Sequence, residues 1–152
     1  MENKTKIEFL KHYEPIHTAF SRFCRAIAAN PEDAEDLLQD AVLNVLEDFG
    51  KIKDLSAFKT YLFSVASNLR KMQLRRNKFK AAFNKNEIEQ IIDHGQNQEH
   101  LVDFTIVYEK ILSLPKETAE ALILFHISDL SLKEIQEIQG SSLSAIKSRL
   151  TR

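Results

Sequence analysis

The fold is decided by the stretch NPEDAEDLLQDAVLNVLEDFG, residues 30–50. Asn30 suits an N-cap and Pro31 the first helical position, and the acidic residues that follow suit the positive end of a helix. Apolar residues then recur every three or four positions on one face, namely Ala34, Leu37, Leu38, Ala41, Val42, Val45, Leu46 and Phe49. The stretch predicts an amphipathic helix with Gly50 at its C-cap.

Helical patterns flank this stretch on both sides. Apolar residues recur at helical spacing from Phe9 to Ile27, and Pro15 is expected to kink or restart that helix. A third helix is expected to begin near Asp54 or Ser56 and to end in the basic run of residues 74–78. It would bury one face made of Phe58, Leu62, Val65, Ala66, Leu69 and Met72. These helices predict one compact domain over residues 1–78.

A second, smaller domain is expected at the carboxyl end. The periodicity weakens over residues 79–103, a stretch rich in Asn, Gln, Glu and His that predicts a linker. Helical order returns over residues 104–152, where Ser131 and Glu134 have the spacing of a capping box. Gly140 permits a tight turn and Ser142 suits the cap of a last helix, as in a helix-turn-helix. The sequence therefore predicts an all-α fold of two small helical domains joined by a linker.

Composition excludes several classes of protein. The chain has 152 residues, 43% of them hydrophobic and 28% charged, with three glycines and three prolines, which favours helices over a turn-rich β fold. No apolar run approaches the roughly 20 residues of a membrane span, and the amino terminus has no signal-peptide pattern. The single Cys24 cannot form an internal disulfide. We expect a cytoplasmic protein without membrane insertion.

Enzymatic residues are not evident in the sequence. The five histidines are scattered and no cysteine cluster accompanies them, so no zinc site is predicted. Isolated glycines supply no phosphate-binding loop, and no nucleophile elbow appears. We assign no catalytic residue, metal or cofactor, and we expect a protein that is not an enzyme.

Charge is segregated along the chain although the formal net charge is −1. Residues 1–50 contain five basic and ten acidic residues, whereas residues 51–85 contain ten basic and one acidic residue. Residues 86–130 are again acidic. Such blocks predict different partners for different faces of the molecule.

Three helix faces are candidate binding surfaces. On the expected third helix a polar stripe ends in cations, and it could follow a nucleic-acid strand: Thr60, Ser64, Asn68, Lys71 and Arg75. Tyr61, and Phe63 pointing largely away from the buried face, could offer rings to unstacked bases. On the last helix, the residues away from the apolar stripe would suit a major-groove reader, namely Ala145, Lys147, Ser148, Arg149 and Arg152. An acidic face could dock a basic protein surface: Asp36, Gln39, Asp40 and Asn44.

Each of these patterns also has an ordinary structural interpretation. A polar stripe or an acidic face fits a solvent-facing helix, and two short helices fit a hairpin that binds no DNA. The patterns gain weight from their combination with the motifs that follow.

Two motif sets resemble a known family. Residues 30–40, NPEDAEDLLQD, and residues 57–68, AFKTYLFSVASN, resemble region 2 of the extracytoplasmic-function sigma factors, the smallest members of the sigma-70 family. Residues 114–124, LPKETAEALIL, together with SLKEI at 131–135 and SAIKSRL at 144–150, are similar to region 4 of the same family. The motifs occur in the family's order and with a linker of the family's length.

The resemblance implies a transcription initiation factor that directs core RNA polymerase to promoters. By this resemblance Asp36, Gln39, Asp40 and Asn44 would bind the clamp helices of the β′ subunit, and the second domain would meet the β flap. An anti-sigma factor is implied as a regulatory partner. The minus-ten promoter element would be bound by Thr60, Tyr61, Ser64, Asn68, Lys71, Arg75 and Arg76. The minus-thirty-five element would be bound by Ser144, Ala145, Lys147, Ser148, Arg149 and Arg152.

The sequence departs from the family pattern at several places. Ser64 stands where a basic residue is usual, and Gln136, Gln139 and Ser141 stand where small or apolar core residues are usual, which predicts a loosely packed second domain. Relatives continue for a few basic turns beyond the position of Arg152, so a truncated or degenerate carboxyl end is expected. Two rival interpretations stay open: a stand-alone helix-turn-helix regulator, and a sigma-like protein-interaction module.

Overall fold

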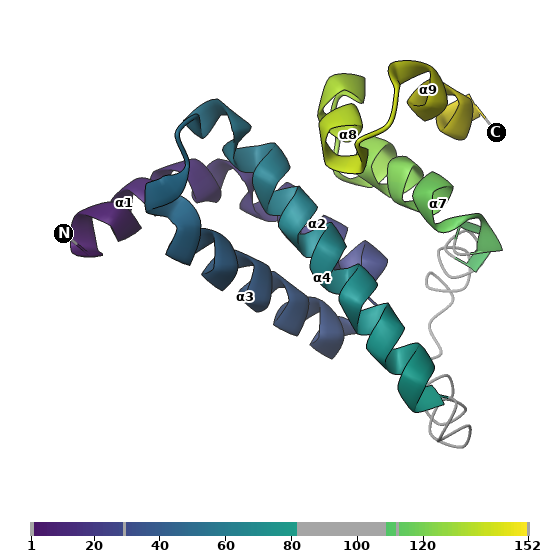
Figure 1. Ribbon diagram of the computed structural model, residues 1–152, viewed down its shortest axis with the longest axis horizontal. Helices are drawn as coiled ribbons and strands as arrows, with labels where there is room; N and C mark the ends of the chain where they lie inside the picture. Colours follow the sequence, from purple (N-terminus) through teal and green to yellow (C-terminus); the bar gives the residue numbers. More distant parts are fainter. Residues whose placement is uncertain (1, 29, 82–108, 112, 152) are drawn as a thin grey trace.

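The computed structural model describes residues 2–28, 30–81, 109–111 and 113–151, and all regular elements in these ranges are helical (Figure 1). The first part of the chain forms α1 (Glu2–Tyr13), α2 (His17–Ile27), α3 (Pro31–Asp48) and α4 (Phe58–Ala81). The last part forms α7 (Lys116–Leu122), α8 (Leu132–Gln139) and α9 (Leu143–Thr151). The all-α prediction is confirmed. Most of the expected linker lies outside the described residues.

The helix ends follow local signals in the sequence, with one exception. The side-chain oxygen of Asn30 accepts a 2.8 Å hydrogen bond from the backbone N–H of Asp33, so the predicted N-cap of α3 is confirmed. Pro15 lies in a short 3-10 turn that separates α1 from α2, as expected. The predicted C-cap at Gly50 is wrong. α3 ends at Asp48 and passes directly into a 3-10 turn, Phe49–Lys51, so no left-handed glycine is needed.

Aromatic rings form much of the core of the first domain. Phe9 packs edge-to-face against Phe49 and Phe58, with ring centroids 5.6 and 5.5 Å apart. The ring centroid of Phe63 lies 5.2 Å from that of Phe20 and 5.1 Å from that of Phe23, and both of these partners are on α2. Edge-to-face and tilted ring pairs add to the free energy gained from apolar burial.

Two predictions about α4 are wrong. Phe63, expected to point away from the core, is fully buried, and Met72, expected to be buried, is 48% exposed. The reason is that α4 packs against both α2 and α3, so its buried arc is wider than a single-partner helix requires. The carboxyl-terminal end of α4 extends past the other helices (Figure 1).

The second domain has the predicted helix-turn-helix signals. Ser131 and Glu134 form a capping box in which each side chain accepts a hydrogen bond from the other's backbone N–H, at 3.1 and 3.0 Å. Gly140 has φ +66°, the left-handed conformation that glycine adopts at low cost. Ser142 caps α9 through the N–H of Ala145 at 3.2 Å.

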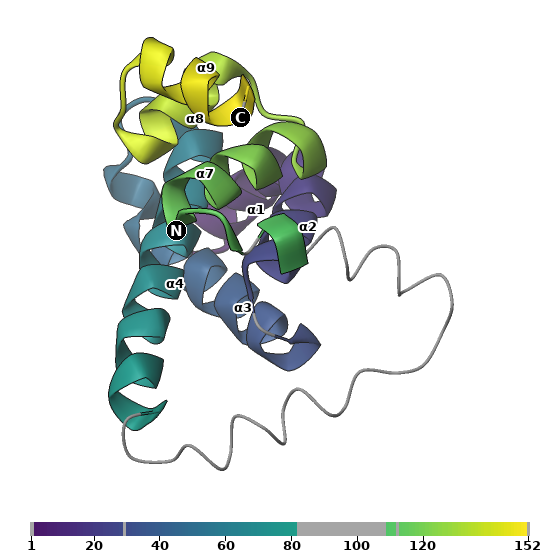
Figure 2. The same cartoon turned by 90° about the vertical axis from the view of Figure 1, so that its right-hand side faces the viewer.

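The two domains pack against each other (Figure 2). α8 contacts α4, and the π-helical turn Ile123–Ile127 that follows α7 contacts α2. The buried side chains of both domains form one continuous cluster. Two polar contacts border it: Ser67 donates a 2.6 Å hydrogen bond to Glu120, and Lys59 lies 3.1 Å from a carboxylate oxygen of Glu134. The face of α4 that carries Lys59 and Ser67 therefore supports the second domain.

Candidate nucleic-acid interface

The acidic face of α3 is open to solvent. Asp36, Gln39, Asp40 and Asn44 are all exposed. The opposite face holds the helix in place, because Leu37, Ala41 and Val45 are fully buried. The structure thus presents four polar side chains, two of them carboxylates, on a rigid helix surface.

The polar stripe on α4 is divided into two parts. Asn68, Lys71, Arg75 and Arg76 are exposed, whereas Thr60 and Ser64 are half-buried. Thr60 also donates a 3.1 Å hydrogen bond to the carbonyl of Ala57. The carboxyl-terminal half of the stripe is therefore the part most accessible to a nucleic acid.

Tyr61 lies at the amino-terminal end of α4, beside the end of α3. The residue is 37% exposed, and its hydroxyl donates a 3.4 Å hydrogen bond to a carboxylate oxygen of Asp48. Partial burial, with the negative charge of Asp48 beside it, raises the pKa of Tyr61 above its ordinary value. The ring borders a shallow depression lined also by Asp48, Lys51, Ile52, Asp54 and Ala57. A neutral, partly exposed ring beside a depression is suited to stacking on a base.

The exposed face of α9 is smaller than the sequence indicates. Ser144, Lys147 and Ser148 are exposed, and Ala145 is half-buried. Arg149 is different, because its side chain is only 17% exposed and its guanidinium donates hydrogen bonds to Glu117, Gln139 and Ser141. Arg152 lies outside the described residues.

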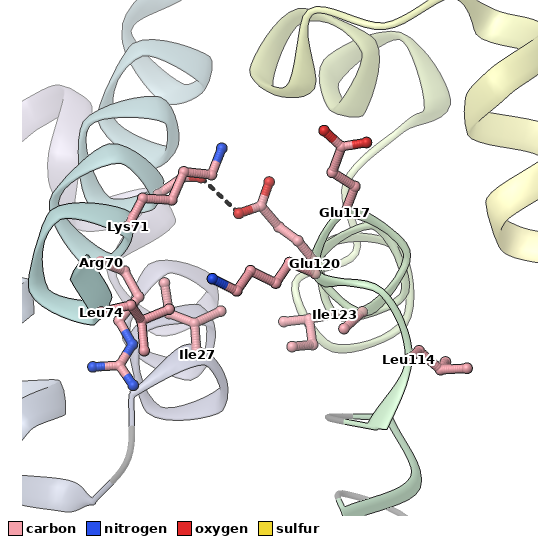
Figure 3. A pocket seen from close by; sticks show the side chains of 11 residues that line it. Ile27, Arg70, Lys71, Leu74, Leu114, Glu117, Glu120 and Ile123 are labelled. Atoms are coloured by element: carbon pink, nitrogen blue, oxygen red, sulfur yellow. Dashed lines mark hydrogen bonds between the residues drawn. The ribbon is translucent and has the colours of Figure 1, made fainter. Parts of the chain in front are cut away.

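A groove runs between α4 and α7, with Ile27 of α2 at its floor (Figure 3). Its lining is mainly apolar and includes Leu74, Leu114 and Ile123. The hydrogen bond between Ser67 and Glu120 crosses it, and Lys71, Lys116 and Glu117 border it. The groove belongs to the boundary between the two domains.

No metal-binding cluster emerges in the part of the chain that the structure describes. In these ranges no three His, Cys, Asp or Glu side chains are close enough to share a metal ion. Cys24 is buried on α2, and burial raises the pKa of its thiol to about 12. Separately, none of the described helices has the length and apolar character needed to cross a membrane.

Two family models match the chain. The family model for Sigma-70 region 2 matches residues 12–80, which contain α2, α3 and all but the last residue of α4. The model for Sigma-70, region 4, matches residues 104–152, which contain the helix-turn-helix. Together the two matches cover most of the chain, in the order that the family uses.

The chain belongs to the extracytoplasmic-function sigma factors of the sigma-70 family. It is accordingly a transcription initiation factor. Curated relatives include the RNA polymerase sigma factor SigV of Bacillus subtilis, 26% identical over 88% of this chain and 78% of that protein. The sigma factor EcfG of Rhodopseudomonas palustris is 25% identical over 86% of this chain and 72% of its own length.

Two solved structures, one of them named as a sigma factor, share the fold of this chain. The sigma factor RpoE of Bartonella quintana, crystallised with the anti-sigma factor NepR, superposes with a TM-score of 0.76 at 21% identity, over 95% of this chain and 91% of that one. CnrH, in complex with the cytosolic domain of CnrY, superposes with a TM-score of 0.72 at 17% identity, over 97% and 82% of the two chains.

The sequence did not reveal the polar contacts between domains. Lys59, Ser67 and Glu120 were not singled out, because each looks like an ordinary polar residue on its own helix, and Glu134 was singled out only for the capping box. The partners are 53 residues apart in the case of Ser67 and Glu120, and no local periodicity reports a pairing over that distance.

Proposed function

We propose that this sigma factor binds core RNA polymerase through the exposed face of α3 and engages promoter DNA through α4 and α9. The proposal rests most on the packing of α3 against α4 in one domain. One rigid unit then carries both an acidic surface for a protein partner and a polar, cationic stripe for DNA. The finer assignment follows the family resemblance, residue by residue.

The polymerase contact is assigned to Asp36, Gln39, Asp40 and Asn44. All four are exposed and lie opposite the buried face of α3, so a partner can reach them without unfolding the helix. Carboxylates on such a surface favour a basic partner and speed its association. The expected partner surface is the pair of clamp helices in β′.

The minus-ten contact is assigned to the exposed part of the α4 stripe together with Tyr61. Asn68 offers an amide for hydrogen bonds to base edges, while Lys71, Arg75 and Arg76 supply cations for the phosphates of the same strand. The ring of Tyr61 can stack on an unpaired base. These groups suit a melted strand, because the two strands of a promoter separate when it is opened.

The minus-thirty-five contact is assigned to the exposed face of α9. Ser144, Lys147 and Ser148 project from the second helix of the helix-turn-helix, the helix that enters the major groove in this motif. Nucleotide addition belongs to the polymerase, so the proposed role requires no catalysis by this chain.

Run-off transcription tests the proposal. Core polymerase from the source organism would be supplied with a promoter library, with and without the protein. Wild type should yield promoter-specific transcripts, and Asp40→Arg and Asn68→Ala should each reduce them at least about tenfold, equivalent to about 1.4 kcal/mol of lost contact. Glu8→Arg on α1 and Thr18→Ala on α2 are matched controls at exposed positions, and both should transcribe normally.

Two other outcomes would replace the proposal. Specific binding of duplex DNA by the purified protein alone, without polymerase, would favour a stand-alone regulator. Polymerase binding that Asp40→Arg abolishes, but with no transcript from any promoter, would favour a protein-interaction module.

An anti-sigma factor is a further proposed partner, because both similar structures are complexes with a partner protein, which is named as an anti-sigma factor for one of them. The apolar groove between α4 and α7 is the candidate contact. Adding such a factor from the source organism should lower run-off transcription. Leu114→Lys, which places a charge at the exposed rim of the groove, should restore transcription with the factor present and change nothing without it.

A further inference from the structure

Arg149 lies on the proposed recognition helix but faces the inside of the second domain. One guanidinium nitrogen donates to the side-chain oxygen of Gln139 at 2.8 Å and to the hydroxyl of Ser141 at 3.0 Å. The other terminal nitrogen donates to a carboxylate oxygen of Glu117 at 2.8 Å. These partners come from α8, from the turn before α9 and from α7, so a single side chain joins all three helices.

Gln139 is itself held in a fixed orientation. Its amide nitrogen donates to the backbone carbonyl of Glu117 at 2.9 Å and to a carboxylate oxygen of Glu120 at 3.2 Å. Its oxygen is thereby directed to Arg149. Gln139 and Ser141 are also two of the positions at which the chain departs from the small or apolar residues usual in the family. Their polar groups supply what a half-buried guanidinium requires.

We propose that Arg149 is a positioning residue that sets the angle of α9 on α7 and α8, and that it does not contact promoter DNA. The inference rests on the proposed function, in which α9 binds the minus-thirty-five element. To reach a phosphate or a base, the guanidinium would have to leave Glu117, Gln139 and Ser141, and a planar guanidinium gives up paired donors at a cost. Lys147, exposed two residues earlier, carries the charge that meets phosphate.

The same network explains how a weakly apolar second domain keeps its helix-turn-helix geometry. α9 is nine residues long, and in the described part of the domain it buries Ile146 completely but leaves Leu143 40% exposed. Apolar contact by so short a helix fixes its position along and around its axis only weakly. The three hydrogen bonds that Arg149 donates to three separate segments fix the position of α9 both along and around its axis.

The test separates positioning from contact by the salt dependence of promoter binding. Holoenzyme containing full-length wild-type or variant protein would be titrated against a duplex that carries the upstream element of a promoter selected in the run-off assay, and against the same duplex with that element scrambled. Each phosphate contact contributes about one unit to the slope of log affinity against log salt concentration. Lys147→Ala should therefore lower the slope by about one unit.

Arg149→Met and Glu117→Gln should behave alike and differently from Lys147→Ala. Each should lower the preference for the intact over the scrambled element by about fivefold and leave the salt slope unchanged. Glu117 is 68% exposed, so Glu117→Gln is expected to fold even if Arg149→Met does not. The double variant Arg149→Glu with Glu117→Arg, which restores opposite charges, should regain part of the preference.

Three results would overturn the inference. A salt slope that falls by about one unit in Arg149→Met, with Glu117→Gln unaffected, would place Arg149 on DNA. A lowered unfolding temperature with an unchanged preference in both variants would reduce Arg149 to a general stabilising role. A wild-type holoenzyme without any preference for the intact element would remove the minus-thirty-five part of the proposed function and this inference with it, a failure visible before any variant is compared.

Discussion

Ser67 on α4 donates a 2.6 Å hydrogen bond to Glu120 on α7, and this bond joins the helix proposed to open the promoter to the domain proposed to bind upstream of it. Ser67 is 3% exposed and Glu120 is half-buried, so the bond lies in the boundary between the two domains. Glu120 also accepts a hydrogen bond from Gln139, which holds Arg149. A continuous polar chain therefore runs from α4 to the proposed recognition helix.

Weakening this boundary should let the domains separate. Ser67→Ala removes a partly buried hydrogen bond to a carboxylate, a bond worth about 1.5–3 kcal/mol. Glu134→Gln keeps the capping box of α8 but removes the charge that faces Lys59, a partly exposed pair worth up to about 1 kcal/mol. Spin labels on cysteines placed at the exposed positions Glu8 and Ser148 would report the separation. The double variant should show a broader and longer distance distribution than wild type.

The matched control for this separation is Glu137→Gln, which removes a charge from an exposed position on the same helix, α8. It should leave the distance distribution unchanged. If the double variant had the same distance distribution as wild type, the polar contacts of Ser67 and Lys59 would not hold the domains together. The apolar cluster alone would then do so.

The buried ring of Phe63 should matter for stability and not for base stacking. Phe63→Ala removes a fully buried side chain that contacts Phe20 and Phe23, and it should lower the free energy of unfolding by about 3–5 kcal/mol. Met72→Ala, on the same helix but half-exposed, should cost less than about 0.5 kcal/mol. The chain has no tryptophan, so urea unfolding would be followed by circular dichroism.

A milder variant keeps the test informative if Phe63→Ala unfolds completely. Phe63→Leu should cost less than about 1.5 kcal/mol and should retain promoter-specific transcription. A folded Phe63→Leu protein that had lost promoter opening would instead support a ring that stacks on DNA.

Glu134 should make the stability of the protein depend on pH. Burial raises the pKa of Glu134, but the hydrogen bond from the backbone of Ser131 and the ammonium of Lys59 lower it more, so the net pKa lies below the ordinary 4.5. Its stabilising contribution is therefore complete above pH 4.5 and is lost as the pH falls through the lower value of the folded state. The difference in unfolding free energy between wild type and Glu134→Gln should shrink in that range. A difference that grew on acidification would contradict this assignment.

What could be predicted from the sequence was local. The N-cap at Asn30, the capping box of Ser131 and Glu134 and the turn at Gly140 each depend on residues within three or four positions of one another, and all three are confirmed. The same holds for the exposed face of α3, which follows from the helical period alone.

Apart from the C-cap at Gly50, the errors concern residues whose surroundings are set by segments distant in sequence or by another helix. Phe63 was misplaced because the packing of α2 on a second face of α4 cannot be read from the period of α4. Gln139 and Ser141 were interpreted as signs of loose packing, whereas they are hydrogen-bond partners of a residue eight to ten positions away. An arginine that contacts DNA and one that contacts only protein can have the same spacing in the sequence of a helix. Only the side chains around the guanidinium in the folded structure distinguish them.

Cys24 should be unreactive in the folded protein. The thiol is buried on α2 and burial raises its pKa to about 12, so the reactive thiolate is scarce and a reagent cannot reach it. A thiol-specific chromogenic reagent at about pH 8 should modify Cys24 only as fast as the first domain opens, and urea should accelerate the reaction. Ser148→Cys, which adds an exposed thiol on α9, should react with one equivalent at once. Rapid modification of native wild type would show that the packing of α2 is open around Cys24.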